Sequence, residues 1–82
     1  MITTFFLITV KAGTDQEIIR KLKSYKEISV KEVYEIYGAF DILARIEAES
    51  EDKISKVRLN LEEDKDVWSI QVVKVSFEWK KA

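Results

Sequence analysis

The sequence predicts an α+β domain in which strands and helices follow one another in the order β-α-β-β-α-β. Four segments are rich in β-branched and aromatic side chains, and two segments between them carry apolar residues at helical spacing. A glycine-centred break separates the two middle strands. Because each half of the chain has the pattern strand-helix-strand, right-handed crossovers would place both helices on one face of a four-stranded antiparallel sheet. We therefore expect a ferredoxin-like βαββαβ sandwich.

The first strand and the first helix are predicted within residues 3–25. Thr3 to Lys11, TTFFLITVK, are mostly β-branched and aromatic and lack helical spacing, which is typical of a strand. Ala12-Gly13 breaks this strand. Thr14 to Glu17 then has the form of a capping box, in which the Thr14 hydroxyl accepts from the backbone N–H of Glu17. The helix that follows has one apolar stripe, made of Ile18, Ile19, Leu22 and Tyr25.

Two strands joined by a short turn form the centre of the chain. Residues 28–37 and residues 41–49 both alternate with the period of a strand. The turn contains Gly38, one of two glycines in a chain without proline, and a link this short implies an antiparallel hairpin. Tyr34 and Tyr37 fall on opposite faces of the first of these strands. We expect one of them to pack under a helix and the other to lie at a subunit interface or a cleft.

The second half of the chain predicts a helix and a long last strand. Ser50 stands before Glu51 and Asp52, which predicts an N-cap followed by acidic residues where the helix dipole favours them. The apolar stripe of this helix is Ile54, Val57 and Leu61. We expect the helix to end around residues 62–66. Residues 67–80, VWSIQVVKVSFEWK, predict the last strand.

Both faces of the predicted sheet carry apolar side chains. Two helices cover one face only, yet Phe5 and Leu7 lie opposite Phe6 and Ile8 in the first strand. Exposed apolar surface forfeits about 25 cal/mol per Å², and soluble monomers rarely expose large patches of it. The chain has 82 residues, no cysteine and no histidine, so it lacks the disulfide or zinc site that often strengthens a small core. We therefore expect an isologous homodimer of the dimeric α+β barrel type, with sheet packed against sheet.

Composition argues against two classes of function. The 14 basic and 15 acidic residues are spread evenly, so no basic stripe is present to neutralise phosphates, and we expect no direct nucleic-acid binding. No apolar run approaches the about 20 residues that span a bilayer, and the first ten residues do not resemble a secretion signal. We expect no membrane association and a cytoplasmic location. Charged residues make up 35% of the chain, mostly lysine and glutamate, which is typical of thermophile proteins.

Catalytic constellations are missing from the sequence. The chain has no histidine and no cysteine, and its carboxylates cluster only at the expected helix end, Glu62-Glu63-Asp64. The sequence therefore lacks the usual constellations of a general base, a nucleophile or metal ligands. We expect no enzymatic activity, no metal and no cofactor.

The stretch from Val30 to Leu43, VKEVYEIYGAFDIL, resembles a known family. The residues that carry the pattern are Val30, Tyr34, Ile36, Gly38, Phe40, Asp41, Ile42 and Leu43. They resemble the effector domain, or RAM domain, of the leucine-responsive regulatory protein/AsnC family, and element order and lengths agree along the whole chain. The resemblance implies a single effector-binding and oligomerisation domain over residues 1–82, without the helix-turn-helix DNA-binding domain of the family's regulators.

The resemblance also implies an assembly and a site. Effector domains of this family form dimers that associate further, often into octameric rings, and they bind amino acids or related small molecules in clefts between dimers. Carried over by residue, the cleft includes Gly38 and Asp41, with Phe40 between them. The neighbouring candidates for ligand binding are Tyr37, Ala39, Ser69 and Gln71. The last strand departs from the family pattern, because Ile70 and Val72 stand where hydroxyl-bearing residues are common.

Several of these residues also have structural explanations. Asp41 either stabilises the turn by accepting a backbone N–H or binds the ammonium group of a ligand. Arg45 and Glu47 share a face of their strand, where they either pair across a subunit interface or lie in solvent. For Trp68 and Trp79, anchoring an oligomer is favoured over forming a ligand cage.

The function expected from the sequence is a stand-alone module that binds an amino-acid-like metabolite, oligomerises, and acts in regulation without binding DNA. One alternative is a purely structural interaction module that pairs with a full-length regulator of the same family. The other is a small cofactor-free enzyme of the dimeric α+β barrel class, since fold alone does not determine function.

Overall fold

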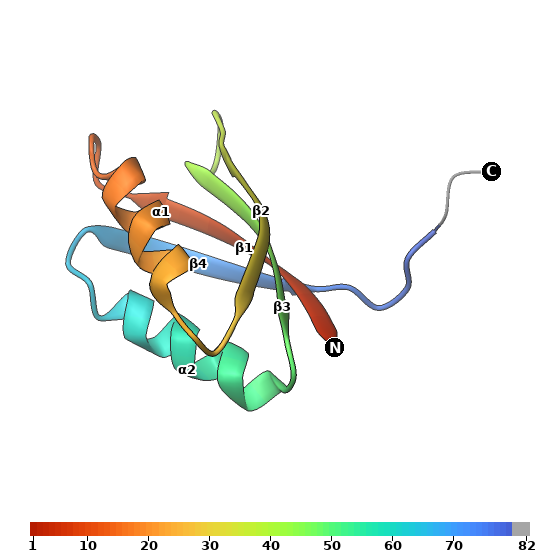
Figure 1. The fold of residues 1–82 in the computed structure, drawn as a ribbon. Coiled ribbons are helices and arrows are strands. Elements are labelled where there is room, and N and C mark those ends of the chain that lie inside the picture. Colours follow the sequence, from red (N-terminus) through yellow and green to blue (C-terminus); the bar gives the residue numbers. More distant parts are fainter. Residues whose placement is uncertain (80–82) are drawn as a thin grey trace.

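The computed structural model describes residues 1–79 and contains the predicted elements in the predicted order (Figure 1). Strands β1 (Ile2–Val10), β2 (Ser29–Glu35), β3 (Ile42–Ala48) and β4 (Val67–Lys74) form one antiparallel sheet in the order β2-β3-β1-β4. Helices α1 (Asp15–Ser24) and α2 (Glu51–Glu62) both pack on one face of this sheet (Figure 1). The prediction of a ferredoxin-like α+β sandwich is confirmed.

The core lies between the sheet and the helices, because every second residue of the central strands is apolar. Thr4 is a buried polar side chain on the same face, and its hydroxyl donates to the carbonyl oxygen of Val73 at 3.0 Å. The predicted apolar stripes of both helices face this core. The buried apolar residues are Phe6, Ile8, Val10, Ile18, Leu22, Ile42, Ala44, Ile46, Ala48, Ile54, Val57, Leu61 and Val67.

The other face of the sheet, here called the open face, is not covered by a helix or strand of the described residues. Its apolar side chains alternate with the core residues along the strands, as the sequence predicts. They are Phe5, Leu7, Leu43 and Val73. The polar residues of the open face are Thr3, Thr9, Ser29, Glu32, Tyr34, Arg45, Glu47, Ser69 and Gln71.

The two helices begin differently. At α2 the Ser50 hydroxyl accepts from the backbone N–H of Lys53 at 3.4 Å, so the predicted N-cap is confirmed. At α1 the Thr14 side chain makes no cap bond, and its hydroxyl donates instead to the carbonyl oxygen of Lys11 at 2.6 Å. The capping box is therefore wrong. The reason is the tight turn at Gly13, with φ of +88°, which brings the Lys11 carbonyl within reach of the hydroxyl.

A β-bulge in each edge strand shifts the alternation of side chains. In β2 the extra residue is Lys31, so Val30 and Val33 both pack against the core although simple alternation would separate them. In β4 the extra residue is Trp68, which is 66% exposed, while Val67 before it is buried. A bulge shifts the alternation by one residue, so the side chains after it point to the opposite face of the sheet. Where both faces of a strand carry apolar residues, the sequence pattern does not reveal the position of the bulge.

Neither Tyr34 nor Tyr37 packs under a helix, so that prediction is wrong. The bulge in β2 places Tyr34 on the open face, and Tyr37 is fully exposed beyond the end of the strand. Tyr25 is the tyrosine that packs against the core, and its hydroxyl donates to the side-chain oxygen of Asn60. Burial raises the pKa of the Tyr25 phenol.

Strand β4 ends at Lys74, earlier than the sequence predicts. The last contact with the sheet is the N–H of Val75, which donates to the carbonyl oxygen of Thr3 at 3.2 Å. Continuing the register places Ser76 opposite Ile2, the first residue of β1, so the residues beyond Ser76 have no neighbouring strand of their own chain to pair with. Residues 76–79 leave the sheet instead (Figure 1). The predicted end at Lys80 lies outside the described residues.

Candidate functional site

The hairpin between β2 and β3 is fastened to its neighbours by backbone hydrogen bonds. The Ile36 N–H donates to the carbonyl oxygen of Asp41 at 2.8 Å, and the Asp41 N–H donates to the carbonyl oxygen of Ile8 at 2.9 Å. Gly38 has φ of +116°, a conformation that glycine adopts at no steric cost. The geometry of the turn therefore accounts for the glycine, and the turn is tied to the central strand β1.

The Asp41 side chain connects this hairpin to β1. Its Oδ2 atom accepts from the backbone N–H of Val10 at 2.9 Å. The pairing of β1 with β3 ends at Ile8, so the carboxylate supplies the acceptor that β3 no longer offers to the buried Val10. Asp41 thus accepts a backbone N–H from the neighbouring strand. A carboxylate has further acceptor capacity, which leaves room for a ligand as well.

Replacing Asp41 with alanine is expected to lower the free energy of unfolding by about 1–3 kcal/mol, because the buried Val10 N–H loses its acceptor. Asp41→Asn retains an oxygen at this place and should keep most of the stability. Urea unfolding followed by tryptophan fluorescence measures both variants. Equal midpoints for the alanine variant and the unmodified protein would show that the bond does not stabilise the fold.

Polar groups from three segments meet beside the hairpin on the open face. Thr9 of β1 and Ser69 of β4 are registered partners, and the Thr9 hydroxyl donates to the carbonyl oxygen of Ala39 at 3.4 Å. Gln71 follows on the same side of β4. Thr9 was missed in the sequence analysis, although its position two residues after Leu7 indicates the same face. We call Thr9, Ala39, Asp41, Ser69 and Gln71 the polar end of the open face.

The two residues of the last strand that depart from the family pattern, Ile70 and Val72, lie on the helix-covered face of the sheet and not on the open face. They are registered with Ile8 and Phe6 and pack against the core, so they do not line the polar end. Ser69 and Gln71 alternate with them and are exposed. The polar groups of β4 are therefore on the face that carries the candidate site.

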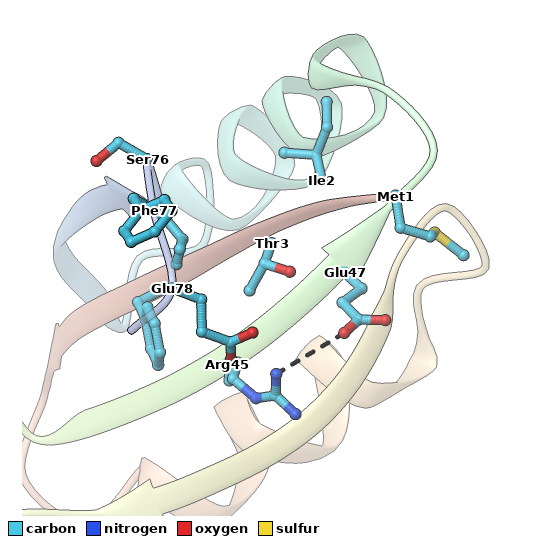
Figure 2. A pocket seen from close by; sticks show the side chains of 10 residues that line it. Met1, Ile2, Thr3, Arg45, Glu47, Ser76, Phe77 and Glu78 are labelled. Carbon is cyan, nitrogen blue, oxygen red and sulfur yellow. Dashed lines mark ion pairs between the residues drawn. The ribbon is translucent and has the colours of Figure 1, made fainter. Parts of the chain in front are cut away.

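The remaining predicted site residues form the tip of the hairpin. Tyr37, Gly38 and Ala39 are exposed, and Phe40 is partly buried. A hollow of 720 Å³ lies at the opposite end of β1, and its lining includes Ile2, Phe5 and Arg45 but no hairpin residue (Figure 2). In a single copy the hairpin and the polar end thus form an exposed surface beside the sheet, which a second molecule could close.

The charged side chains of the open face pair with one another. Arg45 Nε donates to Glu32 Oε1 at 2.8 Å, and Arg45 Nη1 lies 3.8 Å from Glu47 Oε2. Figure 2 draws the ion pair between Arg45 and Glu47. Tyr34 donates to Glu32 Oε2 at 2.9 Å, and Lys31 Nζ lies 3.9 Å from Glu47. The Tyr34 bond, followed by the Arg45 bond, lowers the pKa of Glu32, while the Glu32 carboxylate raises the pKa of Tyr34. The two positive charges of Lys31 and Arg45 thus equal the two negative charges of Glu32 and Glu47.

No group of histidine, cysteine or acidic side chains that could hold a metal ion occurs within residues 1–79. Neither helix in this part of the chain is long and apolar enough to cross a membrane.

Comparison with known proteins gives matches in structure only. Family models and curated proteins show no match to the sequence. A protein from Thermus thermophilus matches with a TM-score of 0.84 at 20% identity, over 99% of this chain and 100% of that one. E. coli AsnC matches with a TM-score of 0.79 at 23% identity, over 99% of this chain and 54% of AsnC. The chain has the Lrp/AsnC effector-domain fold.

A third structure with the Lrp/AsnC effector-domain fold is a transcriptional regulator from Neisseria meningitidis in complex with L-Met. It matches with a TM-score of 0.77 at 19% identity, over 98% of this chain and 53% of the regulator. This chain spans about half the length of AsnC and of the Neisseria regulator, and the whole length of the Thermus protein. The resemblance of residues 30–43 to the Lrp/AsnC effector domain is thus confirmed at the level of the fold.

Proposed function

We propose that this chain is a stand-alone effector-binding and oligomerisation module that acts in regulation without binding DNA or catalysing a reaction. The observation that carries the proposal is the polar end of the open face, where a strand hydroxyl, a hairpin carbonyl and a carboxylate converge beside an exposed turn. The L-Met complex of the Neisseria regulator, which has the same fold, supports an amino acid as the class of ligand.

The chemistry of the polar end suits a zwitterion. The Asp41 carboxylate and the carbonyl groups of the hairpin are acceptors for an ammonium group. The Ser69 hydroxyl and the Gln71 amide are donors for a carboxylate, and both are exposed. The partly buried Phe40 and the exposed Tyr37 offer apolar surface to the ligand's side chain.

The proposed assembly begins with an isologous homodimer through the open face. Phe5, Leu7 and Leu43 form the apolar centre of this face and are only partly buried in a single copy. Its charged residues are paired within the chain, so stacking two identical faces brings no net charge against itself. The polar end lies at one end of the sheet, where a neighbouring dimer could close it. Association of dimers into a larger ring, or with full-length Lrp/AsnC regulators, would then complete the cleft.

Ligand action in this proposal is a shift in assembly. A ligand that is held between two dimers binds only the associated state, so it favours association by its differential affinity. The protein would influence transcription through the assembly state of its partners.

Calorimetric titration with each of the twenty amino acids, with sedimentation in parallel, tests this function. At least one amino acid is expected to give saturable heat and to change the assembly. Ser69→Val should weaken that binding about tenfold, because the ligand carboxylate loses one donor. The control is Ser55→Val, which removes an exposed serine of α2 on the other side of the sheet and should leave binding unchanged. If no amino acid produces heat or a change in assembly, the sensing role is lost and only the scaffold role remains.

A further inference from the structure

The residues after β4 run past the edge of the sheet on the side of its open face. We call residues 75–79 the arm. Lys74 points to the helix side, since its ammonium group pairs with Glu51 of α2. Val73, its neighbour, is on the open-face side, opposite Phe5. The chain bends at Ser76, and Phe77 then lines a hollow together with the open-face residues Phe5 and Arg45, so the arm lies on the side of the open face.

The aromatic residues of the arm are not covered by their own copy. Phe77 is 70% exposed and Trp79 is 86% exposed. Their rings contact each other edge to face, with centroids 5.5 Å apart. Aromatic side chains of this size bury about 150–250 Å² each in a core or an interface, so two of them in water forfeit a large stabilisation. The arm therefore exposes apolar surface of the kind that is usually buried in a protein interface.

The open face has a matching hollow beside the arm. This hollow of 720 Å³ lies between the arm and the first residues of β1, and Figure 2 shows Phe77 on one side of it and Met1 and Glu47 on the other. Ile2 and Phe5 add apolar surface to its lining. Each copy thus carries both a protruding aromatic arm and a hollow with apolar and charged lining next to it, on the same face.

We propose that the arm is a clasp between two copies, in which Phe77 and Trp79 of each copy pack into the hollow on the open face of the other. This inference rests on the homodimer of the proposed function and adds the segment that holds it together. In a dimer with a two-fold axis, each arm packs into the hollow of the other copy, so both arms and both hollows are buried by the same kind of contact. A second copy stacked on the open face must meet the arm, because the arm extends from the edge of that face on the side where the copy lies.

Removal of both aromatic rings tests the energetic role of the clasp. The double variant Phe77→Ser/Trp79→Ser is expected to raise the dimer dissociation constant about 30-fold or more in sedimentation equilibrium, since buried aromatic anchors dominate interfaces. The matched control is Leu59→Ser, which removes an exposed apolar side chain from α2 and should leave the dissociation constant unchanged. Equal dissociation constants for the double variant and the unmodified protein would overturn the clasp.

Trp79 fluorescence tests where the arm packs. The chain has two tryptophans, so Trp68→Phe leaves Trp79 as the sole emitter. Its emission is expected to shift to the blue, and its quenching by acrylamide to fall, as the protein concentration rises through the dissociation constant of the dimer. A dimer in which Trp79 stays red-shifted and quenchable would overturn the clasp and leave the dimer intact. A blue shift already present in the monomer would show that the arm folds onto its own copy, which also overturns the clasp. A protein that stays monomeric at every concentration would refute the proposed assembly itself.

Discussion

Alanine in place of Phe6 is expected to lower the free energy of unfolding by about 3–5 kcal/mol. The Phe6 side chain is 0% exposed in the central strand β1, between its registered neighbours Ala44 and Val72. Ala44 is too small to fill the space that the ring leaves, so a cavity remains. Small domains have total stabilities of only about 5–15 kcal/mol, and the variant should be largely unfolded at moderate denaturant. Guanidinium unfolding followed by circular dichroism measures the effect.

The neighbouring residue provides the control for Phe6. Phe5 has the same side chain but lies on the open face, where it is only partly buried in a single copy. At concentrations low enough to keep the protein monomeric, Phe5→Ala should lower the free energy of unfolding much less than Phe6→Ala does. Equal losses in the monomer would contradict the assignment of the two faces of β1.

Lysine in place of Leu7 is expected to convert the proposed homodimer into a monomer at micromolar concentration. Leu7 is at the centre of the open face, between Leu43 of β3 and Gln71 of β4. In an isologous interface the substitution would bury an unpaired ammonium group from each copy, which costs several kcal/mol per ion. In the monomer the same lysine reaches water, so the fold should be retained. Sedimentation equilibrium measures the assembly, and circular dichroism measures the fold.

Leu59→Lys is the matched control for this second prediction. Leu59 is an exposed leucine of α2, and a charge there should change neither fold nor assembly. A Leu7→Lys protein that still sediments as a dimer would place the subunit interface on a surface other than the open face.

The elements of this fold follow from local patterns in the sequence. The alternation around Phe6 and Ile8 predicts a strand with one face in the core, and both residues are fully buried in β1. Ser50 followed by two acids predicts a helix start, and its hydroxyl caps α2. Gly38 marks the hairpin because a positive φ needs a glycine. These features depend on residues close in sequence, so a single segment contains the information.

The predictions that were wrong depend on contacts between distant segments. The alternation of β2 and β4 is broken by bulges at Lys31 and Trp68, whose positions are determined by pairing with the neighbouring strand. The Thr14 hydroxyl donates to the Lys11 carbonyl and makes no cap bond to α1, because the turn before it decides which carbonyl is near. Strand β4 ends at Lys74, and the chain bends away at Ser76, close to the place where β1 begins.

For the candidate site too, some features follow from the sequence and others only from the tertiary structure. The sequence by itself determined the order of elements, the apolar character of both faces of the sheet, and the hairpin with Gly38 and Asp41. Only the tertiary structure decided that Asp41 accepts the N–H of Val10, that Thr9 joins the hairpin to β4, and that the arm runs past the sheet with its aromatic rings uncovered. The physical reason is that side-chain periodicity is a property of one segment. The partner of a hydrogen bond or an exposed ring is determined by which strands lie beside it.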